Sequence, residues 1–66
     1  MTLTINGHPR DFASAPTLPE LLESLGLKDK PVVIEHNQEA LSPSEFQGRP
    51  LQNGDSLEII TIAAGG

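Results

Sequence analysis

The chain has 66 residues, too few to divide its apolar side chains between two cores, so we expect a single domain. Its 9 acidic and 4 basic residues give a formal net charge of −5, and its aromatic residues are 2 phenylalanines, which together disfavour nucleic-acid binding. It contains no cysteine, which excludes a disulfide framework, a cysteine-based zinc site and a thiol nucleophile.

The first predicted elements form a hairpin. Residues 1–6 alternate between apolar and polar side chains, which is typical of a half-buried strand. Asn6-Gly7 follows and is a strong hairpin signal, because both central residues of a type I′ turn need positive φ. A return strand over about residues 9–13 should place Phe12 toward the core, and its initial proline favours the edge of a sheet. The core-facing side chains of the first strand are predicted to be Met1, Leu3 and Ile5.

The next predicted element is a helix that begins after Thr17. Thr17 and Glu20 have the spacing of a capping box, in which each side chain bonds the backbone amide of the other residue. Gly26 should end the helix in the left-handed conformation, with Leu27 folded back onto the last turn. The helix places four leucines on one apolar stripe: Leu18, Leu21, Leu22 and Leu25.

The second half of the chain predicts strands separated by tight turns. Asn37 and Gln38 form one turn, and Asn53-Gly54-Asp55 forms another. Phe46 should cover one end of the core. In chain order the elements are a strand over residues 31–37, a short return strand over 39–41, a helical turn over 42–46 and a final strand over 56–62.

This order of elements predicts an α+β fold of the ubiquitin-like β-grasp type. We expect a mixed sheet of four to five strands, with one main helix packed across one face. The final strand is the most apolar, so it should lie centrally beside the first strand. The β-grasp domain is assigned to residues 1–62, and residues 63–66 are predicted to form a flexible C-terminal tail.

The side chains predict no conventional active site. His8 and His36 are expected to be surface histidines, and neither Asp11 nor Glu35 completes a metal-ligand spacing with them, so no metal site is predicted. The serines have no partnering base that would activate a nucleophile. The carboxylates indicate a solvated face: Glu20, Glu23, Glu35, Glu39 and Glu58.

The tail is predicted to carry the chemistry instead. Gly65 and Gly66 have no Cβ, and Ala63 and Ala64 are small, so the segment can enter a channel too narrow for larger side chains. A carboxylate becomes an acyl donor only when its oxygen is made a good leaving group, as in an ATP-derived adenylate. The activated acyl group at Gly66 can then accept sulfur and become a thiocarboxylate. The alternative is that the diglycine is merely a frayed chain end.

These features, in this order and over essentially the whole chain, resemble the ThiS family, the sulfur carrier proteins of thiamin biosynthesis. The segments that carry the resemblance are Asn6-Gly7, Leu18-Pro19-Glu20-Leu21-Leu22, Val33-Ile34-Glu35-His36-Asn37, Pro43 with Phe46, Asn53-Gly54-Asp55, Leu57-Glu58-Ile59 and Gly65-Gly66. Ser44 follows Pro43 where a basic residue is common in the family.

The resemblance implies a carrier protein that is not an enzyme and binds no cofactor. An E1-like, ThiF-like enzyme would use ATP to adenylate the carboxylate of Gly66. A sulfurtransferase or cysteine desulfurase relay would then supply the sulfur, and a ThiG-like thiazole synthase would accept it. Gly65 would keep the tail thin for these partners.

Alternation along the final strand predicts a partner surface. If Leu57 and Ile59 face the helix, then Glu58, Ile60 and Ile62 lie on the opposite face, where two exposed aliphatic side chains favour docking. The alternative is that they are ordinary isolated aliphatics on the outer face of a sheet. We expect the free protein to be a monomer.

Other functions fit the same pattern. A carrier for molybdopterin synthesis would use the same terminal chemistry, whereas a β-grasp interaction module would act by binding alone, with an incidental diglycine. A ubiquitin-like modifier would instead form isopeptide bonds. No apolar run approaches the ~20 residues that span a bilayer, and no signal peptide is evident, so a cytoplasmic protein without a membrane partner is expected.

Overall fold

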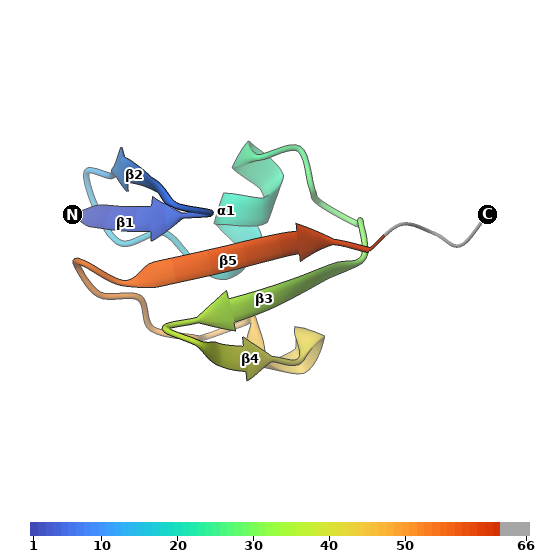
Figure 1. Cartoon of the computed structure of the whole chain (residues 1–66). Coiled ribbons are helices and arrows are strands. Elements are labelled where there is room, and N and C mark those ends of the chain that lie inside the picture. Colours follow the sequence, from blue (N-terminus) through green and yellow to red (C-terminus); the bar gives the residue numbers. More distant parts are fainter. Residues whose placement is uncertain (63–66) are drawn as a thin grey trace.

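The computed structural model describes residues 1–62, and the predicted tail over residues 63–66 lies outside them. The described part is a five-stranded sheet with one α-helix on one face, as predicted (Figure 1). In chain order its elements are β1 (Thr2–Ile5), β2 (His8–Asp11), α1 (Leu18–Ser24), β3 (Val32–His36), β4 (Glu39–Leu41), a 3₁₀ helix (Pro43–Glu45) and β5 (Ser56–Thr61).

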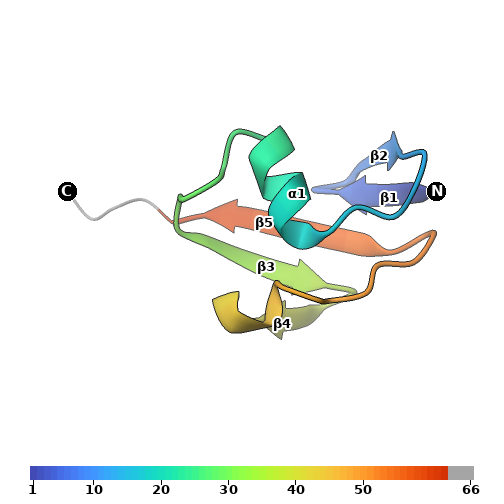
Figure 2. The same cartoon turned by 180° about the vertical axis from the view of Figure 1, so that it is seen from behind.

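The strand order across the sheet is β2-β1-β5-β3-β4, so β5 is central and lies beside β1, as its apolar character predicts. β1 and β5 are parallel, whereas the other neighbouring pairs are antiparallel, which makes the sheet mixed. Seen from behind, α1 lies across the sheet over its central strands (Figure 2). Among residues 1–62, no helix has the length and apolar character that a membrane crossing requires.

The N-terminal hairpin turns at Asn6 and Gly7, whose φ angles are 50° and 82°. Both values are positive, as a type I′ turn needs. β2 is exposed along its whole length and forms one edge of the sheet. It starts one residue earlier than predicted, and Phe12 follows it, half-buried against the core.

Helix α1 has both of its predicted caps. The Glu20 amide donates to Thr17 Oγ1 at 3.2 Å, and the Thr17 amide donates to Glu20 Oε1 at 2.8 Å. At the other end Gly26 has φ 75°, its amide donates to the Glu23 carbonyl, and the Leu27 amide donates to the Leu22 carbonyl. These two bonds form a Schellman motif, which satisfies carbonyls that the end of the helix would leave free.

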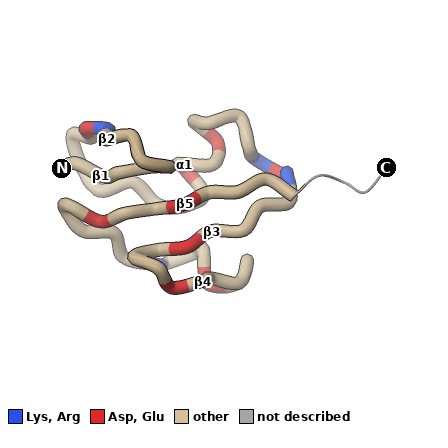
Figure 3. The backbone as a smooth tube through the Cα atoms, viewed as in Figure 1, with Lys and Arg blue, Asp and Glu red and all other residues tan. Residues whose placement is uncertain are grey.

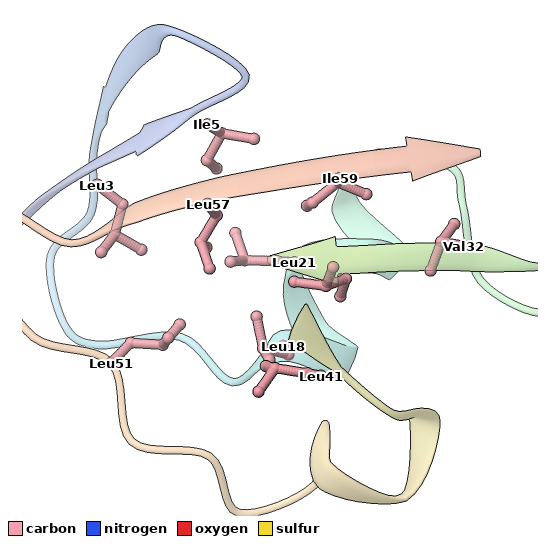
Figure 4. Packing of buried hydrophobic residues seen from close by; sticks show 10 residues of the cluster. Leu3, Ile5, Leu18, Leu21, Val32, Leu41, Leu51, Leu57 and Ile59 are labelled. Atoms are coloured by element: carbon pink, nitrogen blue, oxygen red, sulfur yellow. The ribbon is translucent and has the colours of Figure 1, made fainter. Parts of the chain in front are cut away.

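The hydrophobic core lies between α1 and the sheet and draws on every strand except β2 (Figure 4). The side chains from β1, β3 and β5 that alternate toward the helix are buried, so one face of the sheet is apolar. Leu51 joins them from the loop before β5. The buried residues are Leu3, Ile5, Leu18, Leu21, Val32, Ile34, Leu41, Leu51, Leu57 and Ile59.

Candidate functional site

Histidine 36 is buried, so the prediction that it lies on the surface is wrong. It is the last residue of β3 and is 7% exposed. Arg49 Nε donates to His36 Nδ1 at 3.0 Å, and His36 Nε2 lies 2.7 Å from Asp55 Oδ2. An arginine only donates, so Nδ1 accepts from Arg49, and Nε2 is the ring nitrogen left to bond Asp55 Oδ2. Both nitrogens are therefore occupied in structural bonds.

Side chains elsewhere in the described part do not form a reactive centre. His8 is exposed on β2, away from His36 at the end of β3. Within residues 1–62 no three or more His, Cys, Asp or Glu side chains approach closely enough to hold a metal ion. The candidate functional site is therefore the outer face of β5, together with the segment that β5 leads into.

The outer face of the sheet, opposite α1, carries an exposed apolar patch. Ile60 is 53% exposed, Ile62 51% and Val33 36%. Val33 and Ile60 are directly opposite each other on β3 and β5. The alternation of β5 predicts the exposure of Ile60 and Ile62, and the structure adds Val33 to them. We call Val33, Ile60 and Ile62 the outer-face patch.

Acidic side chains adjoin the outer-face patch. Glu58 on β5 lies directly opposite Glu35 on β3. Along β5, Glu58 is two residues before Ile60 of the patch. Figure 3 shows acidic residues along β3, β4 and β5. Like charges in directly opposite positions of a sheet repel each other, so this pair favours the approach of a positively charged group.

The end of β5 is held firmly to β3. Val32 pairs with Thr61, and one residue further the Ile62 amide donates to the Pro31 carbonyl at 3.0 Å. The predicted site residues Ala63, Ala64, Gly65 and Gly66 follow directly in the sequence and lie outside the described residues. The structure thus brings Glu58, Ile60 and Ile62 together beside the point where this segment begins.

Comparison with known proteins agrees with this architecture. Residues 3–66 match the model of the ThiS family. The sulfur carrier protein ThiS of Thermus thermophilus is 39% identical over 62 residues, which cover 94% of this chain and 95% of that protein. The crystal structure of the thiamine biosynthesis protein (ThiS) from Geobacter metallireducens has a TM-score of 0.81 and 30% identity, with 100% of both chains covered.

A longer protein also contains a similar segment. A thiazole synthase of Paramagnetospirillum magneticum is 36% identical over 66 residues, and the whole of this chain spans 20% of that protein.

Proposed function

The chain belongs to the ThiS family and is a sulfur carrier protein of thiamin biosynthesis, not a catalyst, and we propose that the carboxylate of Gly66 is the group that carries the sulfur. This proposal rests on one observation above the others. The central strand of the sheet runs past an exposed apolar patch and leads, directly after Ile62, into the segment that ends in Gly65-Gly66.

The proposed chemistry has two steps. The carboxylate oxygen of Gly66 attacks the α-phosphorus of ATP, pyrophosphate leaves, and an acyl-adenylate forms. A sulfur nucleophile at the oxidation level of hydrosulfide then attacks the carbonyl carbon. The bond from this carbon to the AMP oxygen breaks, AMP leaves, and the product is a thiocarboxylate. The carrier needs no catalytic side chain of its own, because the activating enzyme binds the ATP.

The outer-face patch supplies the docking surface in this proposal. An apolar centre formed by Val33, Ile60 and Ile62 excludes water from the interface, and Glu35 and Glu58 beside it pair with basic side chains of the partner. With Ile62 docked, Ala63, Ala64 and Gly65 would pass through a channel in the partner to its active site. The small side chains of this segment support a narrow channel.

The proposed partners act in sequence on the same surface. A ThiF-like, E1-like enzyme adenylates the carrier. A sulfurtransferase or cysteine desulfurase relay provides the sulfur as a persulfide, which a thiol reductant, itself oxidised to a disulfide, brings to the hydrosulfide level. A ThiG-like thiazole synthase accepts the sulfur from the carrier. The match to a segment of a thiazole synthase supports this acceptor. The use of ATP supports a cytoplasmic reaction.

We propose a monomer in the free state, because the large apolar side chains that residues 1–62 expose form a small patch. These side chains are Val33, Ile60 and Ile62. Sedimentation velocity at micromolar concentration tests this, and a stable dimer would contradict it.

The proposal is tested by the intact mass of the protein, purified from cells limited for thiamin. We expect a species heavier by the difference between one sulfur and one oxygen atom, located in the C-terminal peptide and absent after deletion of Gly66. If ATP and the activating enzyme yield neither adenylate nor thiocarboxylate, the diglycine is incidental and the protein acts by binding alone.

Transfer assays with the thiocarboxylate form of the carrier also distinguish between the related functions. Sulfur transfer to thiazole synthase, and none to molybdopterin synthase, is expected of a thiamin-type carrier. Adducts on lysine side chains of other proteins would instead indicate a ubiquitin-like modifier.

A further inference from the structure

Asn6 bonds the backbone of a distant residue with both ends of its side chain. Its Oδ1 accepts from the Ile59 amide at 2.7 Å, and its Nδ2 donates to the Ile59 carbonyl at 3.1 Å. The two residues are separated by 53 positions in the sequence. The side chain therefore connects the N-terminal turn to the central strand β5.

This contact continues a pairing that β1 leaves incomplete. β1 pairs with β5 at Thr4 with Ser56 and at Ile5 with Leu57, and the Asn6 amide then donates to the Leu57 carbonyl at 2.9 Å. Beyond this bond the main chain turns away into β2. A carboxamide carries one acceptor and a donor group, as a peptide unit does. The side chain of Asn6 thus takes the place of the next residue of β1.

The turn alone does not require this side chain. Asn6 has φ 50°, a conformation that glycine adopts more easily and that aspartate also tolerates. Aspartate accepts hydrogen bonds but has no donor when ionised, and glycine offers neither. Of these residues only asparagine bonds both the amide and the carbonyl of Ile59.

We propose that Asn6 is a positioning residue for the carrier reaction, and this inference rests on the function proposed above. On one edge, β5 pairs with β3 as far as Thr61, and the Ile62 amide bonds the Pro31 carbonyl just before β3. Asn6 holds the other edge at Ile59, three residues before Ile62. Because both of its edges are bonded, the last part of β5 has a single orientation relative to the sheet. The carboxylate of Gly66 then reaches the α-phosphorus of ATP more often, because a reaction between bound groups depends steeply on their alignment.

A matched pair of variants tests this role. Asn37 also begins a turn with positive φ, 49°, and its Oδ1 also accepts from the backbone of β5, at the Ser56 amide, 2.9 Å away. Ser56 is at the opposite end of β5 from Ile62. Asn6→Gly and Asn37→Gly therefore make the same change in two turns of the same kind beside β5. They differ in position along β5 and in the second bond of the side chain, because Asn37 Nδ2 donates to Asp55 Oδ1 at 3.1 Å where Asn6 Nδ2 donates to the Ile59 carbonyl.

The readout is adenylation by the activating enzyme, with pyrophosphate release measured against the concentration of carrier. We expect Asn6→Gly to lower kcat about fivefold to twentyfold and to leave KM within about twofold, because the outer-face patch is kept. Asn37→Gly should leave both constants near those of the unchanged protein. Amide hydrogen exchange at Ile59 should be faster in Asn6→Gly alone.

Asn6→Asp supplies a second test if Asn6→Gly unfolds. It keeps the acceptor for the Ile59 amide and loses the donor, so kcat should be intermediate. Equal losses of kcat in Asn6→Gly and Asn37→Gly, or no loss in Asn6→Gly or Asn6→Asp, would overturn the inference. Failure of the unchanged protein to form an adenylate would instead remove the proposed function itself.

Discussion

His36 Nε2 and Asp55 Oδ2 lie 2.7 Å apart and join the end of β3 to the turn that precedes β5. Both side chains are largely buried, 8% and 13% exposed. Arg49 extends the contact, since its Nε donates to His36 and its Nη2 donates to Glu39 Oε1 at 2.8 Å. This network fixes the long loop between β4 and β5 to the end of the sheet.

Replacement of His36 should therefore destabilise the fold. His36→Leu fills the buried site with an apolar side chain but removes the hydrogen-bond partner of Arg49 Nε and Asp55, so we expect a loss of about 1–3 kcal/mol in the free energy of unfolding. Urea denaturation measures it. His8→Leu is the matched control, because His8 is exposed and should change stability by at most about 0.5 kcal/mol. Equal effects of the two substitutions would contradict the structural role of His36.

The same network predicts a dependence of stability on acid pH. Burial acts to raise the pKa of Asp55, but hydrogen bonds from the Gln52 amide, His36 and Asn37 outweigh it and hold the pKa below its ordinary value of 3.8. The folded protein thus binds this proton less readily than the unfolded chain. The stabilising contribution is fully present above the pKa of the unfolded chain, taken as the ordinary 3.8, and is lost as pH falls through the lower folded pKa.

Asp55→Asn removes this titration. The difference in unfolding free energy between the unchanged protein and Asp55→Asn should shrink as pH falls from about 5 to about 2. Comparison of the two proteins cancels other carboxylates, such as Glu39, whose pKa is lowered by its hydrogen bond and charge interaction with Arg49. A difference that stays constant over this range would show that Asp55 does not titrate differently in the two states.

Substitution in the outer-face patch should weaken docking without harming the fold. Ile60→Thr keeps a β-branched side chain at this 53% exposed position, so stability should change little. Loss of apolar contact should raise the KM of the activating enzyme for the carrier by about tenfold, which corresponds to about 1.4 kcal/mol. Thr61→Val is the control, since Thr61 alternates to the other face of β5. An unchanged KM for Ile60→Thr would exclude the patch as the docking surface.

A side chain at Gly65 should block the reaction. Gly65→Val adds bulk next to the reacting carboxylate, where misplacement by about 1 Å can cost about 10²-fold in rate, so adenylation should fall by about this factor. The melting temperature should not change, because the buried core lies between Leu3 and Ile59. Ala63→Ser, a small change further from Gly66, serves as the control. Full adenylation of Gly65→Val would argue against a narrow channel.

Local sequence patterns determined the elements and their order. The spacing of Thr17 and Glu20 predicts the start of α1, and Gly26 predicts its end, because caps depend on residues within one turn. Alternation along β5 predicts that Leu57 and Ile59 are buried while Ile60 is exposed. The apolar character of β5 also predicts its central place. The family resemblance rests on the same patterns and is confirmed.

Tertiary structure alone decided the contacts between segments far apart in the chain. His36 is buried because Arg49 and Asp55, 13 and 19 residues away, bond its two ring nitrogens. Val33 joins Ile60 through strand register, and Asn6 reaches Ile59 across 53 residues. Such pairings depend on how the strands align in space. A polar residue whose partner lies on another strand has the same local sequence pattern whether it is exposed or buried, so its burial follows from the packing of the sheet.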